Sequence, residues 1–274
     1  MAVDPIESAA YEFTAQVERF YAGLMRAATR VAEVSPLRPG NHDSHSRQEP
    51  NLGGKLLYAG QLDAEARALI VAANIAGAAS LTATADSATA KQAMRDGVVD
   101  FLVTSLDEAL RILKNEIRKR EAVAVCVAVT PDLLEEQMRQ RGVAPDLLRQ
   151  TRIAASPHHR AVPIEPLSAQ QGQYIIAWSA ATAPALWLPK LDVIALSCID
   201  SEDGATRRWL RQAPRYLGRM AQGLRLLRCT EPTAGILRAQ IQQRVECSEI
   251  QIPVELVINL DGQCEKFRFS PPAC

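Results

Sequence analysis

The sequence predicts an α/β protein, in which a long helix precedes a parallel sheet with flanking helices and a second, smaller α/β unit follows it. Strand-like and helix-like segments alternate between residues 55 and 142, and repeated βα units of this length form parallel sheets with helices on both faces. Near the C-terminus, Asp261 and Gly262 separate two strand-like segments, which is the signal of a two-residue β-hairpin.

The composition is that of a globular protein. Of 274 residues, 47% are hydrophobic and 23% charged, and the 31 basic residues equal the 31 acidic ones. Net charge therefore provides no general attraction to nucleic acid or to an anionic membrane. No segment approaches the roughly 18 apolar residues of a spanning helix, the N-terminus is acidic, unlike a signal peptide, and the six cysteines have no regular spacing. We expect a cytoplasmic protein without a membrane segment.

Two stretches rich in helix-breaking residues divide the chain, at 35–54 and 155–172. The predicted organisation is an N-terminal helix (1–34), a polar loop (35–54), the parallel-sheet domain (55–154), a linker (155–172) and the second α/β unit (173–274).

The N-terminal helix has a clear start and one apolar face. Asp4 is its predicted N-cap, Pro5 suits the first helical position, and Glu7 completes a capping box. Apolar residues then recur at alternating spacings of four and three, which forms a continuous stripe: Phe13, Val17, Phe20, Leu24, Ala27 and Val31.

The middle of the chain provides four strands and four helices. The segment 122–129 is an uninterrupted apolar run with β-branched residues, typical of a strand buried on both faces. Ser105 and Glu108 form a capping box, and Pro131 and Gly142 mark the two ends of another helix. We predict strands at 55–59, 80–85, 98–104 and 122–129, with helices at 63–78 and 87–95, after Ser105, and from 131 to 142.

The last third is less regular. Its apolar runs predict strands at 174–179, 192–198, 254–260 and 265–269, and its helical spacings predict helices at 206–228 and 233–245.

The loop after the first strand is where a doubly wound domain would bind a dinucleotide. Close approach of a pyrophosphate needs glycines, and only Gly60 is present there. Asp63 and Glu65 fall in the first helical turn, where they would occupy the free N–H groups and repel phosphate, while Arg67 offsets one charge. The segment can be interpreted as a degenerate nucleotide site or as a self-capped structural turn, and we favour the second interpretation.

Several polar residues could have either a functional or a structural role. Asp86 follows the second strand, as a ribose-binding acid or, as we favour, as the N-cap of the next helix. His158 and His159 are weak candidates for a general acid or base, against a solvated linker. His42 and His45 lack further ligands nearby, so we expect no metal site. Cys126 and Cys198 are expected to be core residues.

Residues 207–228 hold seven arginines and no acidic residue. Interpreted as one amphipathic helix, the segment has candidate anion-binding or nucleic-acid-binding cations, and the alternative is pairing with acids of this chain or of a second subunit. The candidates are Arg207, Arg208, Arg211, Arg215 and Arg219, followed by Arg225 and Arg228.

The order of several short motifs resembles the NAD-binding domain of urocanase (urocanate hydratase). The motifs lie at 53–56 (GGKL), 59–60 (AG), 72–77 (AANIAG), 97–100 (GVVD), 105–109 (SLDEA), 141–147 (RGVAPDL) and 150–151 (QT), and the preceding helix at 11–22 also matches.

The resemblance implies a Rossmann-like domain for residues 55–154, a homodimer, and tightly bound NAD that acts as an electrophile toward the imidazole of urocanate. The chain departs from the family at the site itself. A glycine-rich loop of the form GLGGMxGAQ is replaced by Gln61-Leu62-Asp63-Ala64-Glu65-Ala66, and the acid at the end of the second strand falls on Thr84.

Three functions are compatible with these observations. We favour a urocanase-like protein without hydratase activity, a homodimer that acts as a small-molecule-binding or assembly module and needs no cofactor. The first alternative is a divergent hydro-lyase or nucleotide-dependent enzyme. The second is a phosphate or nucleic-acid binder that uses the arginine-rich segment, although we expect no nucleic-acid partner.

Overall fold

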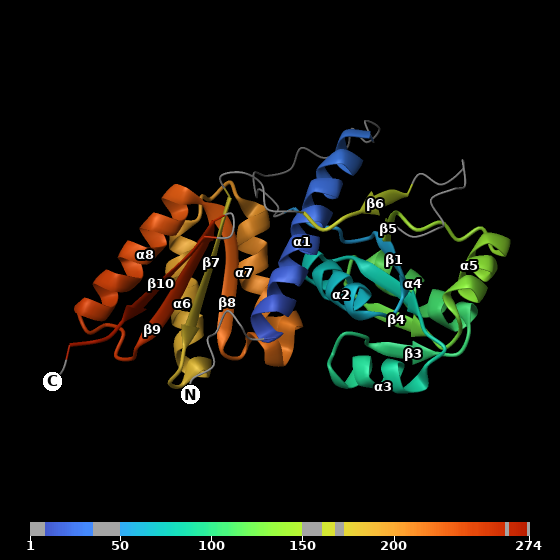
Figure 1. Ribbon diagram of the computed structural model, residues 1–274. Helices are drawn as coiled ribbons and strands as arrows, with labels where there is room; N and C mark the ends of the chain where they lie inside the picture. The colour runs from blue at the N-terminus through green and yellow to red at the C-terminus, as the bar shows by residue number, and fades with distance from the viewer. Residues whose placement is uncertain (1–8, 35–49, 150–160, 168–172, 261–262, 273–274) are drawn as a thin grey trace. The chain divides into compact units, whose positions relative to one another are not determined.

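The computed structural model describes residues 9–34, 50–149, 161–167, 173–260 and 263–272 (Figure 1). Its contacts divide the chain into two units, Arg19–Leu167 and the combination of Met1–Glu18 with Ser168–Cys274. The boundary falls inside the first helix, α1 (Ala9–Val34), which contributes residues to both units. The cap predicted at Asp4, Pro5 and Glu7 lies outside the described residues.

The unit Arg19–Leu167 contains a six-stranded parallel sheet, which confirms the predicted fold class. The order of strands is β3-β4-β2-β1-β5-β6. Their bounds are β1 (Leu56–Gln61), β2 (Ala79–Ala83), β3 (Phe101–Val103), β4 (Ala124–Val127), β5 (Leu147–Arg149) and β6 (Val162–Ile164).

The strands β5 and β6 are additional to the prediction. Each has only three residues, too few for an apolar period to be visible. The strand β6 lies within the 155–172 stretch that we interpreted as a linker, and its Pro163 is compatible with the edge position that this strand occupies.

The strand order places the helices on two faces of the sheet. The helices are α2 (Ala64–Ala76), α3 (Ser87–Arg95), α4 (Leu106–Lys119) and α5 (Pro131–Gln140). From β1 through β2 to β3 the chain moves along the sheet in one direction, and from β3 through β4 to β5 it moves back. Because parallel crossovers are right-handed, α2 and α3 cover one face and α4 and α5 the other.

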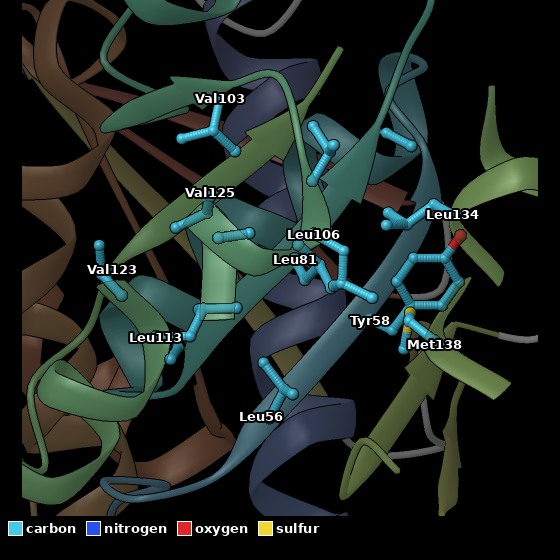
Figure 2. Packing of buried hydrophobic residues seen from close by; sticks show 14 of the residues in the cluster. Leu56, Tyr58, Leu81, Val103, Leu106, Leu113, Val123, Val125, Leu134 and Met138 are labelled. Atoms are coloured by element: carbon cyan, nitrogen blue, oxygen red, sulfur yellow. The ribbon is translucent and has the colours of Figure 1, made fainter. Parts of the chain in front are cut away.

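The face under α4 and α5 forms an extensive apolar cluster (Figure 2). Side chains from β1, β2 and β4 meet those of the two helices there, among them Tyr58, Leu81, Val125, Leu113 and Leu134. The helix α2 is buried on all sides from Ala68 to Ala76, which is the pattern of a helix inside a domain.

The segment after β6 packs against α1. The N–H of Leu167 donates to the Arg19 carbonyl at 2.9 Å. A Cβ at Gly23 would lie 2.2 Å from the Glu165 carbonyl oxygen, so no other residue fits there. The chain therefore returns from the sheet edge onto the helix that precedes the domain.

The second unit contains a four-stranded antiparallel sheet with the order β10-β9-β7-β8. Its elements are β7 (Gln173–Ala180), α6 (Pro184–Cys198), α7 (Gly204–Leu217), β8 (Leu224–Thr230), α8 (Glu231–Glu246), β9 (Val254–Leu260) and β10 (Gln263–Phe269). The strands β9 and β10 pair antiparallel from Leu260 and Gln263 onward, which confirms the C-terminal hairpin, although its turn residues lie outside the described part.

The strand predicted at 192–198 is wrong. These residues form the end of α6, a helix of 15 residues that begins at Pro184, a favoured first helical position. A short apolar run fits a buried helix as well as a buried strand, and here the length of the whole apolar stretch decides for the helix.

The single helix predicted at 206–228 is also wrong. The helix α7 ends at Leu217, and a short 3-10 turn (Gly218–Ala221) leads to the strand β8, which holds Arg225 and Arg228. Gly218 has a φ of 55°, a left-handed conformation that favours glycine and stops a helix. The leucine spacing had suggested a helix, but Leu224 and Leu226 alternate with Arg225 as in a strand.

The apolar stripe predicted for the first helix is buried within the chain: Val17, Phe20, Leu24 and Ala27 of α1 are all buried. The leucines of the segment 206–228 are buried as well, among them Leu210, Leu217, Leu224 and Leu227. A homodimer therefore remains a prediction from the family resemblance alone. In the described part of the chain, no helix is long and apolar enough to cross a membrane.

A buried ion pair joins α1 to the antiparallel sheet within the second unit. The guanidinium of Arg228 donates to both carboxylate oxygens of Glu18 at 2.7 and 2.6 Å, and to Gln173 Oε1 at 3.1 Å. The side chains of Arg228 and Glu18 are only 10% and 4% exposed. Near the N-terminus of α1, Tyr11 and Ala15 pack on Ala177 of β7 and on Leu224 and Leu226 of β8.

Removing one partner of this pair should destabilise the unit strongly. We expect Arg228→Ala to lower the free energy of unfolding by about 3–5 kcal/mol, because Glu18 would stay buried without a counter-charge. The double variant Glu18→Leu, Arg228→Met should lose much less. Urea unfolding followed by tryptophan fluorescence reports this unit selectively, because all three tryptophans, Trp178, Trp187 and Trp209, lie in it.

The matched control is Glu249→Ala, which removes an exposed partner of Arg244 and should change stability by only about 0–1 kcal/mol. An Arg228→Ala protein as stable as this control would show that the buried pair contributes nothing.

Candidate functional site

The strand order creates a switch point between β1 and β5. From β1 the chain continues through α2 to β2 on one side, whereas β5 lies on the other side of β1. In open α/β sheets, ligands bind beyond the carboxyl ends of the strands at such a reversal. The residues that follow β1 and that end β5 therefore form the candidate site.

The end of β1 turns sharply into α2. Gly60 has a φ of 72°, and the pairing of β1 with β2 is irregular between Tyr58 and Gln61. The Thr82 hydroxyl donates to the Gly60 carbonyl at 2.9 Å. Asp63 then caps α2, since its Oδ1 accepts from the N–H of Ala66 at 2.8 Å. The self-capped turn that we favoured is present.

Arg149, at the end of β5, pairs with both acids of this turn. Its Nη1 lies 2.8 and 3.0 Å from the two carboxylate oxygens of Asp63, and its Nη2 donates to Glu65. The Arg149 side chain is 14% exposed, against 45% for each acid. We call Asp63, Glu65 and Arg149 the switch-point cluster. It joins the end of β5 to the turn that follows β1.

The counter-charge of this turn differs from the one we expected. Arg67 pairs with Asp96 and does not offset the acids of the turn, and Arg149 does so instead. Arg149 was not among the predicted site residues, because the three-residue strand β5 that positions it was not predicted. Had Leu147 and Leu148 been interpreted as a strand, Arg149 would have been placed at the same sheet edge as Asp63.

The neighbouring strand ends in a second local network. Thr84 is buried, and its hydroxyl accepts from the N–H of Asp86 at 3.2 Å and from Gln61 Nε2 at 3.4 Å. Asp86 caps α3 by accepting from the N–H of Ala88 at 2.9 Å, and from the Thr89 hydroxyl at 2.6 Å. This hydroxyl lowers the pKa of Asp86 below its usual value. The N-cap that we favoured for Asp86 is thus present.

The arginine-rich segment does not form one cationic face. Arg225 pairs with Asp192 at 2.9 Å, Arg228 is buried against Glu18, and Arg207 donates to the carbonyls of Leu196 and Ile199. Arg208, Arg211, Arg215 and Arg219 lie on α7 and the turn after it, where Arg208 and Arg211 have further interactions and Arg215 stacks on the Tyr216 ring.

The remaining candidates add no second site. His42, His45, His158 and His159 lie outside the described residues. Cys126 is buried, and burial raises its pKa to about 11, so the thiol stays protonated near neutral pH. Cys198 is only partly buried, at the end of α6. Among the described residues, no group of three His, Cys, Asp or Glu side chains is arranged to hold a metal ion.

Comparison with known families agrees with the fold of the parallel-sheet unit. Residues 43–170 match the family model described as the urocanase Rossmann-like domain. This segment is a urocanase-family, Rossmann-like domain. The urocanase-like domain includes all six strands of the parallel sheet and the whole switch-point cluster, and the match ends before the antiparallel sheet.

The cap of α2 should be measurable by itself. We expect Asp63→Ala to destabilise the first turn of α2 by about 1 kcal/mol, which corresponds to roughly fivefold faster amide exchange near Ala66. Asp63→Asn should stay close to the wild type, because asparagine caps nearly as well. Hydrogen exchange followed by mass spectrometry measures both variants.

Thr130→Ala is the control, since Thr130 is the N-cap residue of α5 but makes no side-chain cap bond. Equally fast exchange in Asp63→Asn and Asp63→Ala would mean that the charge of Asp63, and not its cap, holds the turn.

Proposed function

We propose that this chain is a urocanase-related binding or assembly module that lacks urocanate hydratase activity and does not bind NAD in the manner of the family. The switch-point cluster is the observation that carries the proposal. Its carboxylates stand where a pyrophosphate would need free N–H donors at the start of a helix.

Admitting a pyrophosphate at the start of α2 would require two rearrangements. The Ala66 N–H would have to leave Asp63, at a cost of about 0.5–2 kcal/mol for a lost cap. Arg149 would have to release both acids, each such pair being worth about 0–1 kcal/mol at this exposure. The released acids would then repel the incoming phosphates. These effects all oppose binding at this helix.

Titration of NAD tests this proposal directly. We expect isothermal calorimetry to detect no binding to the wild type up to millimolar NAD. In the double variant Asp63→Ala, Glu65→Ala, the α2 N–H groups and Arg149 become available, so weak binding should appear. The control Asp132→Ala, Glu136→Ala removes two acids from α5 and should leave NAD unbound.

Micromolar affinity in the wild type, with NAD located over residues 60–66 in a crystal structure, would overturn the proposal. Equal micromolar affinity in the wild type and in the double variant would place the ligand elsewhere on the chain; it would contradict the expected absence of binding but not the occupied start of α2.

The absence of hydratase activity is tested separately. We expect the ultraviolet absorbance of urocanate to persist when the purified protein is added, with or without NAD, at the rate of a heat-denatured sample. The physical reason is that the catalytic electrophile, NAD, has no site at the switch point. Turnover above that background would show that the chain is an enzyme after all.

A further inference from the structure

A groove on the urocanase-like domain lies along α4, away from the switch-point cluster. Its volume is about 570 Å³, within the range of roughly 300–1,000 Å³ that is usual for small-molecule sites. Its walls come from one stripe of α4, the start of β1, and the loop after α5: Leu56, Asp107, Leu110, Arg111, Leu113, Lys114, Ile117, Arg141, Gly142 and Val143.

The floor of the groove is the outer part of the domain core. Leu56 and Leu113 belong to the buried cluster under α4 (Figure 2). Leu110, Ile117 and Val143 pack against that cluster but are only partly buried. An apolar group placed in the groove would extend the core and remove these side chains from water, which is favourable.

The charged residues of the groove differ in whether they have a partner within the chain. At the N-terminal end of the α4 stripe, Arg141 donates through both nitrogens to Asp107, with the longer bond at 2.9 Å. The hydrogen bond from Arg141 lowers the pKa of Asp107, and the nearby charge of Arg111 adds to this effect. Within the described part of the chain, neither Arg111 nor Lys114 forms an ion pair or hydrogen bond. Two exposed cations thus stand beside an apolar floor, while Asp107, the one carboxylate among the lining residues, is paired with Arg141.

We propose that this groove binds a small amphiphilic anion, a molecule with a ring or branched apolar body and a carboxylate or phosphate group. The body lies on Leu110, Ile117 and Val143, and the anionic group is held by Arg111 and Lys114. Guanidinium and ammonium groups form charge-assisted hydrogen bonds to such oxygens.

The volume of the groove favours a small molecule, because about 570 Å³ is the size of a site that encloses one such ligand. The Arg141–Asp107 pair stands at one end of the α4 stripe that lines it. The proposal is independent of the switch point, because the two sites share no residue.

Indole-3-propionate and tryptamine are matched probes, since both have an indole ring but they carry opposite charges. Calorimetry should show binding of indole-3-propionate and at least about tenfold weaker binding of tryptamine, because Arg111 and Lys114 attract the carboxylate of the first probe and repel the ammonium group of the second. Amide shifts in NMR spectra should locate the probe at residues 107–117 and 141–143.

The variant Arg111→Gln, Lys114→Gln should weaken indole-3-propionate about tenfold or more. The control Arg118→Gln, Lys119→Gln removes the same charge from the same helix but lies outside the groove, so it should bind the probe like the wild type.

Four results would overturn the proposal: no binding of indole-3-propionate at millimolar concentration, equal affinity for tryptamine, equal loss in the control variant, or binding of inorganic phosphate alone with the same affinity. Binding of an acidic amphipathic helical peptide but not of indole-3-propionate would assign the groove to a protein partner instead. Because NAD plays no part in these titrations, their failure is distinguishable from failure of the proposed function.

Discussion

The burial of β1 on both faces and along both edges is the constraint on which the urocanase-like domain depends. Leu57, Tyr58 and Ala59 have no solvent-exposed surface, so each polar group of this strand needs a partner inside the protein. Asp146 accepts from the N–H of Leu56 at 2.9 Å and returns its own N–H to the Leu56 carbonyl. The Tyr58 hydroxyl donates to Glu135 at 3.1 Å, and burial raises the pKa of both side chains.

This constraint also sets the geometry at the end of the strand. The last buried carbonyl, that of Gly60, accepts from Thr82, and the following residue pair turns the chain out of the sheet into α2. The α2 helix starts with unpaired N–H groups at an edge where β5 also ends. Asp63 satisfies one of these groups, and Arg149 balances the charge that Asp63 introduces. The switch-point cluster is therefore a consequence of how a buried central strand must end here.

The predictable parts of the fold were those determined by neighbours in sequence. The first four strands, the helices between them and the caps at Asp63 and Asp86 depend on periods and spacings of a few residues. The predictions for 192–198 and 206–228 were wrong because the spacing of their apolar residues fits both a helix and a strand. Only the length of α6 and the left-handed Gly218 decide which structure forms. The pairs Arg228–Glu18 and Arg149–Asp63 join residues far apart in sequence, so no local pattern could indicate them.

The same distinction explains what could be inferred about the site. Two carboxylates in the first turn of a helix can be recognised from the sequence, because capping involves residues close together in the chain. They predict that the free N–H groups at the start of the helix already have an acceptor. Arg149, which could not be predicted, changes the charge of this turn. Without Arg149, the two acids would leave two uncompensated negative charges at the turn, whereas Arg149 offsets one of the two charges from within the chain. Asp63 accepts the helix N–H that a phosphate oxygen would accept, and Arg149 supplies the counter-charge that a phosphate would seek. The acceptor and the counter-charge at this turn thus both come from the chain itself, which is the physical basis of the proposal that NAD does not bind here.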